Sequence, residues 1–65
     1  MIDARQRKNI KEDLFVEIVQ KHHQQSGELT RGIVSKILTN STRHPHGIKV
    51  QLKSGLIGRV KNIIE

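Results

Sequence analysis

The C-terminal half of the chain alternates apolar and polar positions with a period of two. Residues 48–52 read I-K-V-Q-L, so three aliphatic residues fall on one side and Lys49 and Gln51 on the other. Such alternation is typical of a β-strand with one buried face. We therefore expect a strand over 48–52 and a partner strand over 56–60, L-I-G-R-V, which returns after a short turn.

The N-terminal half predicts two further strands, over 14–20 and 29–39. The second reads L-T-R-G-I-V-S-K-I-L-T, and its alternation breaks at Ser35-Lys36, which predicts a bulge or a sharp bend. Gly32 in the same run favours close packing. The tail, K-N-I-I-E at 61–65, fits either one short helical turn or a last strand.

The turn around Gly55 decides which residues of the two C-terminal strands face each other. A two-residue turn would pair Val50 with Arg59 and direct the arginine into the core. A three-residue loop with Gly55 in the left-handed conformation pairs Val50 with Gly58 instead. We expect the second register, because a slip of one residue would exchange the two faces. It places Lys49 directly opposite Arg59 on the outer face, where like charges repel.

These strands predict an all-β fold, a small SH3-like barrel of about five short strands. The chain has 65 residues, which allows a single domain. We expect a flexible basic arm over 1–13 and the barrel over 14–65. A closed barrel is favoured over an open sheet, because closure removes most exposed edges. The expected core consists of Val16, Ile18, Leu29, Val34, Ile37, Ile48, Val50, Leu52, Leu56 and Val60.

The charge balance favours an anionic partner. Twelve Lys and Arg residues stand against six Asp and Glu residues, a formal net charge of +6. Such an excess in a short chain favours nucleic acid. Cysteine is absent, and no apolar run reaches the length of a membrane span. We expect a cytoplasmic protein with no membrane partner. The small size and the absence of a phosphate-loop motif argue against an enzyme, and no cofactor is expected.

The outer face of the predicted sheet suggests how nucleic acid would be held. We expect a binding module for RNA, more than for DNA, that contacts the phosphate backbone with low sequence specificity. The preference for RNA rests only on analogy with the SH3-like barrels of translation and transcription proteins. Aromatic residues make up 2% of the chain, which argues against base stacking. The expected contact residues are Lys49, Arg59, Lys53, Lys61, Arg31, Arg43 and His44.

Two alternatives remain open. A protein-interaction module could dock a peptide or a ribosomal or transcription protein through Phe15, Val19 and Ile57. A weaker alternative is a metal-binding regulator that uses the histidines at 22–23 and 44–46, although adjacent histidines on an extended segment point to opposite sides. The simpler interpretation of H-P-H is a loop that Pro45 stiffens before the strand.

Six motifs cover most of the chain: N-I-K at 9–11, V-E-I-V at 16–19, S-G-E-L-T-R-G-I-V at 26–34, I-L-T-N-S at 37–41, H-P-H-G-I-K-V at 44–50 and G-L-I-G-R-V at 55–60. Together they resemble the YwbE-like family of small uncharacterised bacterial proteins. The resemblance covers most of the chain and implies no established activity, so it assigns no catalytic residue. One departure is Glu12-Asp13, which stands where a Pro-Gly turn is expected. A weaker resemblance links the strand pattern to KOW-type and other SH3-like barrels.

Overall fold

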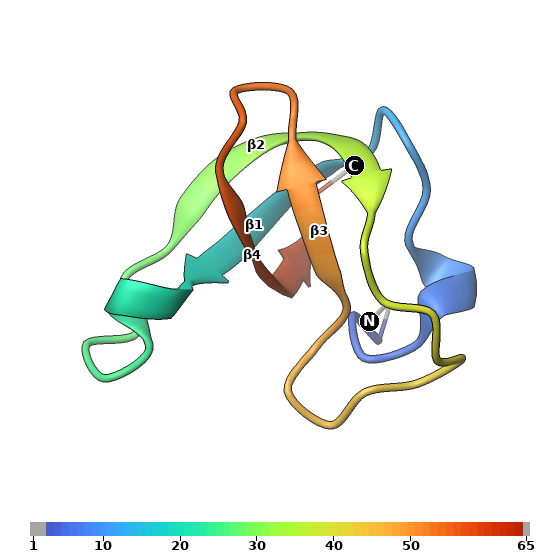
Figure 1. The fold of residues 1–65 in the computed structure, drawn as a ribbon, viewed down its shortest axis with the longest axis horizontal. Helices are drawn as coiled ribbons and strands as arrows, with labels where there is room; N and C mark the ends of the chain where they lie inside the picture. The colour runs from blue at the N-terminus through green and yellow to red at the C-terminus, as the bar shows by residue number, and fades with distance from the viewer. Residues whose placement is uncertain (1–2, 65) are drawn as a thin grey trace.

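The chain folds into a closed barrel of four antiparallel strands (Figure 1). Each strand pairs with the next, and β4 also pairs with β1, which closes the sheet. Among the described residues, no helix combines the length and the apolar composition needed to cross a membrane. The computed structural model describes residues 3–64, with strands β1 (Phe15–Gln20), β2 (Thr30–Ile37), β3 (Lys49–Leu52) and β4 (Ile57–Ile63).

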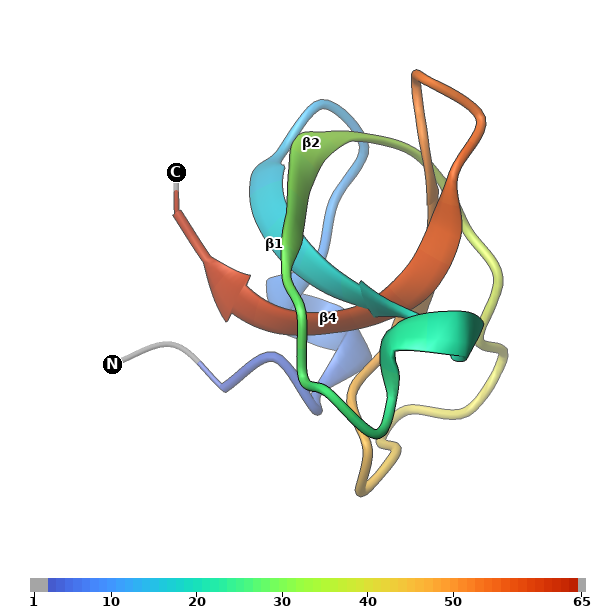
Figure 2. The ribbon, with the colours of Figure 1, turned by 90° about the vertical axis from the view of Figure 1, so that its left-hand side faces the viewer.

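Two short 3₁₀ turns complete the secondary structure. The turn η1 (Arg7–Asn9) precedes β1, and η2 (Lys21–His23) follows it directly. The two turns lie at opposite ends of the barrel, as the two perpendicular views show (Figure 2). The loop after η2 therefore stands at the end of the barrel that is far from η1.

The predicted all-β barrel is confirmed, the expected number of strands is wrong, and the tail forms a strand, one of the two forms expected for it. Residues 3–64 contain four strands instead of about five. The tail does not form a helical turn, because β4 continues to Ile63 along β1. Asn62 lies opposite Glu17 and Ile63 opposite Val16, and the Ile64 N–H donates to the Phe15 carbonyl at 2.9 Å. Pairing with β1 satisfies backbone groups that an isolated helical turn would leave to water.

The predicted register of the C-terminal hairpin is confirmed. Lys49 lies opposite Arg59, and Val50 lies opposite Gly58. Gly55 has a φ of 94°, which is the left-handed conformation that the three-residue loop requires. The aliphatic residues of β3 consequently face the barrel interior, and the cations face outward.

The sheet is bent by two bulges, of which the sequence predicted one. In β2, Val34 pairs with Leu52 while Lys36 pairs with Gln51, so Ser35 is the extra residue, as the broken alternation predicted. A second bulge, which the sequence does not reveal, lies in β4 opposite β1 and makes Lys61 the extra residue. Bulges increase the local twist and redirect side chains, and this one redirects the strand at Lys61.

Most of the predicted core is confirmed. Two predicted members are wrong, since Leu29 and Leu56 are 42% and 40% exposed. Both stand where the chain leaves the barrel, Leu29 before β2 and Leu56 at the tip of the β3–β4 hairpin. Ile37 is partly buried. The confirmed members are Val16, Ile18, Val34, Ile48, Val50, Leu52 and Val60.

The N-terminal segment packs against the barrel, in contrast to the predicted arm. Ala4 and Ile10 are buried in the same cluster as the strand residues. The Ile48 N–H donates to the Ala4 carbonyl at 3.1 Å, and a bridge joins Gln6 to Arg43. Isolated apolar residues in a polar run give no periodic signal, so the sequence alone did not reveal this contact. Residues 1–2 lie outside the described residues.

Replacing Ile10 with alanine tests whether the segment is part of the core. We expect Ile10→Ala to lower the free energy of unfolding by roughly 2–4 kcal/mol, because truncating a buried Ile leaves a cavity. Urea unfolding followed by circular dichroism measures the change. The matched control is Lys8→Ala on the neighbouring exposed position, with an expected change within about 0.5 kcal/mol. Equal effects of the two variants would contradict the packing of this segment.

Candidate functional site

Strands β3 and β4 bring cations to one outward-facing surface, beside β1. Arg59 on β4 lies between Lys49 on β3 and Val19 on β1, its partners in the two neighbouring ladders. Paired residues in a sheet present their side chains on the same face. Val19 is only 5% exposed although it shares this face, and Arg59 is half-buried. The surface therefore has an apolar base beside a partly sheltered guanidinium group.

Three adjoining hollows form a basic groove along this surface. The lysine hollow is bordered by Lys21, Lys49 and Arg59. The histidine hollow shares Arg59 with it and is also bordered by His44 and His46. The N-terminal hollow shares His46 and Lys61 with the histidine hollow and continues to Arg5. Because neighbouring hollows share residues, the three together make one continuous groove.

The loop at 21–28 makes one wall of the groove. Two of its residues, Gln24 and Gly27, line the histidine hollow. The loop is closed by a contact of 2.7 Å between His23 Nε2 and a Glu28 carboxylate oxygen. The Gly27 N–H also donates to the His23 carbonyl at 2.8 Å. These contacts lie within the loop and fix its shape directly after β1.

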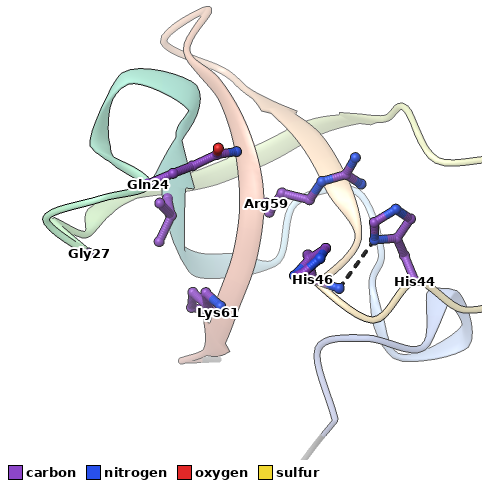
Figure 3. A pocket seen from close by; sticks show the side chains of 7 residues that line it. Gln24, Gly27, His44, His46, Arg59 and Lys61 are labelled. Atoms are coloured by element: carbon purple, nitrogen blue, oxygen red, sulfur yellow. Dashed lines mark hydrogen bonds between the residues drawn. The ribbon is translucent and has the colours of Figure 1, made fainter.

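The H-P-H loop makes the opposite wall, and Gly47 holds it against β4. Gly47 has a φ of 100°, and a Cβ there would collide with the Val60 carbonyl oxygen. The Gly47 carbonyl accepts a hydrogen bond from Nη1 of Arg59 at 3.2 Å. A glycine is thus required at this position, and its carbonyl orients Arg59. In Figure 3 the side chain of Arg59 extends toward His44.

His44 is a neutral imidazole in this arrangement. The His46 N–H donates to Nδ1 of His44 at 3.2 Å, so that nitrogen carries no proton and the ring hydrogen is on Nε2 (Figure 3). Desolvation lowers the pKa of His44 below its ordinary value of 6.5, and the positive charges of Arg59 and His46 lower it further. The lowered pKa of His44 disfavours a positive charge on it near pH 7, whereas Arg59 and Lys61 bring positive charge to the histidine hollow.

The structure brings four of the predicted contact residues to the groove. Lys49, Arg59, Lys61 and His44 all border it. Among residues 3–64, the only Lys and Arg side chains that form ion pairs are those of Arg5, Arg31 and Lys53. The groove cations Lys49, Arg59 and Lys61 therefore have no carboxylate partner in the described part of the chain.

The other predicted contact residues lie away from the groove. Lys53 pairs with Asp13 at 2.7 Å, and Arg31 donates to Glu17 at 2.8 Å. The hydrogen bond from Arg31, followed by that from Asn62, lowers the pKa of Glu17. These two cations are thus neutralised locally. Arg43 is exposed and borders none of the three hollows.

Sequence reasoning missed several residues of the groove, among them Lys21, Gln24 and His46. Lys21 and Gln24 belong to a polar run that has no periodicity, and only the 3₁₀ turn η2 brings them over β1. His46 was assigned to loop structure alone, although it borders two hollows. The signal that could have found the wall was Val19, an apolar residue on the outer face of β1 that needs a cover.

The histidines do not gather into a metal site within residues 3–64. No group of three or more His, Asp or Glu side chains in that range is placed to hold a metal ion. His22 and His23 lie on η2 with ring centroids 4.0 Å apart, so the expectation that they point to opposite sides is wrong. That expectation assumed an extended segment, whereas the 3₁₀ turn brings successive side chains closer.

Comparisons with known proteins confirm the resemblance predicted from the motifs. Residues 3–63 match a family model described as "Uncharacterized conserved protein (DUF2196)". The chain is 49% identical over 63 residues to "Uncharacterized protein YwbE" of Bacillus subtilis (strain 168), with 97% of each chain covered. No solved structure matches the chain.

The pKa of His44 provides a test of the site. In an NMR pH titration we expect His44 to titrate below pH 6.5, because burial and two positive neighbours disfavour the imidazolium. Arg59→Gln should raise the pKa of His44 part of the way to its ordinary value, since one positive charge is removed. The control Lys36→Gln, an exposed position that borders no hollow, should leave it unchanged. A His44 pKa that is unaffected by Arg59→Gln would contradict this geometry.

Proposed function

The chain belongs to the family of uncharacterised conserved proteins DUF2196, and we propose that it is a nucleic-acid-binding module that holds the phosphate backbone of RNA in the basic groove. The proposal is one of binding without a catalytic step. Phosphate oxygens accept hydrogen bonds from the ammonium and guanidinium groups that border the groove. Such contacts position a nucleic acid but carry little information about its sequence.

The observation that carries this proposal is the unneutralised pair Lys49 and Arg59. They face each other across β3 and β4, and no carboxylate within residues 3–64 forms an ion pair with either. Like charges at paired positions destabilise a sheet by some tenths of a kcal/mol. A bound phosphate reverses this repulsion, because its negative charge lies close to both cations. Lys61 and Lys21 extend the same favourable field along the groove.

The preference for RNA over DNA is the finer part of the proposal. It comes from analogy with the SH3-like barrels of translation and transcription proteins, and the closed antiparallel barrel is compatible with that analogy. Side chains with donors and acceptors, such as Gln24 at the rim, could recognise a ribose 2′-hydroxyl. The analogy concerns fold, so the comparison of RNA with DNA must be made by direct measurement.

A protein-interaction module is the second candidate, and one observation favours it. Ile57 is 42% exposed at the edge of the lysine hollow, next to the exposed Leu56. Val19, which was expected in the docking surface, is 5% exposed and therefore offers little area. Docking through apolar contacts should persist at moderate salt, whereas phosphate binding should weaken steeply.

Charge reversal at Lys49 tests the proposed function. We expect Lys49→Glu to weaken binding of a mixed-sequence 12-nucleotide RNA by about tenfold or more at 50 mM salt. Each phosphate contact to a single strand contributes a slope of roughly −0.7 to the plot of log affinity against log salt. The slope should therefore become shallower in the variant. Fluorescence anisotropy with labelled RNA measures both quantities, and DNA of the same sequence tests the RNA preference.

The matched control is Lys36→Glu, which changes the net charge equally at an exposed position outside the groove. Equal losses in Lys49→Glu and Lys36→Glu would show that net charge alone causes the attraction. Affinity that does not depend on salt, or no measurable affinity for RNA or DNA, would contradict the proposal.

A further inference from the structure

The histidine hollow differs from the rest of the groove because it offers more than positive charge. Its volume is about 500 Å³, within the range of sites that hold small organic ligands. Val19 and Arg59 line it from β1 and β4, and both residues also line the adjoining lysine hollow. The difference lies in His44 and His46, which border the histidine hollow, whereas Lys21 and Lys49 border the lysine hollow. A surface that bound phosphate alone would need only its lysine and arginine side chains. It would not need the imidazole rings.

The two walls of this hollow carry groups that suit a nucleic-acid base. His44 and His46 stand on one wall with ring centroids 5.9 Å apart, and Gln24 stands on the other (Figure 3). Imidazole rings and guanidinium planes are surfaces on which unpaired bases stack. The Gln24 amide has both donors and an acceptor, so it can pair with polar base edges. The single Phe and the absence of Trp and Tyr therefore do not exclude stacking.

Cations lie on both sides of the histidine hollow. A nucleic-acid strand that passed through the hollow would place its phosphates beside them. Lys61 joins the histidine hollow to the N-terminal hollow. Lys49 and Lys21 lie in the lysine hollow on the other side, beyond Arg59. None of these three cations is paired with a carboxylate in residues 3–64. The arrangement matches one unstacked nucleotide with a phosphate before it and a phosphate after it.

We infer that the partner is single-stranded, and that the histidine hollow receives one of its nucleotides with the base between Gln24 and the H-P-H loop. A duplex keeps its bases stacked and paired, so it can insert a base only by flipping it out at an energetic cost. A single strand has only the smaller cost of unstacking the base. This inference rests on the proposed function and deepens it, because it names the form of nucleic acid that the same groove accepts.

A glutamine pair in the 21–28 loop allows a matched test. Gln24 lines the histidine hollow, whereas Gln25 is exposed and lines none of the three. Fluorescence anisotropy of the full chain would compare a 12-nucleotide RNA with the same RNA in a duplex, at 50 mM salt. We expect at least tenfold tighter binding of the single strand. Gln24→Ala should weaken it about three- to tenfold and leave duplex binding unchanged, while Gln25→Ala should have no effect.

The outcomes separate the inference from the proposed function. Equal affinity for the single strand and the duplex, with Gln24→Ala and Gln25→Ala behaving alike, would overturn the inference while nucleic-acid binding itself stands. No binding to either form would overturn the proposed function. As a second readout, millimolar AMP or UMP should shift the NMR signals of His44, His46 and the Gln24 side-chain amide. The absence of shifts at all three groups would also count against the hollow as a nucleotide site.

Discussion

The groove depends on the closure of the barrel at Gly58. There β4 pairs with β3 and β1 at once, since Gly58 lies opposite Val50 on one side and Gln20 on the other. A Cβ at Gly58 would lie 2.6 Å from the Val19 carbonyl oxygen, so only glycine lets the strands approach this closely. Closure brings Val19 beside Arg59 and thereby joins the two halves of the groove.

The same closure explains why cations gather on one surface. Seven aliphatic side chains, each at most 1% exposed, fill the interior, so the alternating residues of β3 and β4 must face outward. The outward residues include Lys49 and Arg59, while Glu17 is held by Arg31 and Asn62 on another part of the sheet. The core thus fixes the position of charges that repel each other, and their mutual repulsion is small beside the burial that fixes them.

Periodic signals predicted the strands well, and non-periodic contacts were missed for a physical reason. The alternation over 48–52 and the turn at Gly55 predicted the hairpin register, including Lys49 opposite Arg59. Broken alternation predicted the bulge at Ser35. By contrast, Ala4, Ile10 and the 21–28 wall are placed by tertiary packing, which leaves no pattern along the chain. The candidate site was therefore predicted on its strands and at His44, and it was missed in the 21–28 wall.

The way in which the walls are held bears on how the groove would bind. The Gly47 carbonyl orients Arg59, the His23–Glu28 pair closes the loop, and Gly47 itself fits against Val60. Groups that are already ordered lose less conformational entropy when a ligand arrives than groups on a free segment do. Cations on a mobile arm would attract nucleic acid without selecting its form. Cations fixed around a hollow of defined size can distinguish a strand that enters the hollow from one that cannot.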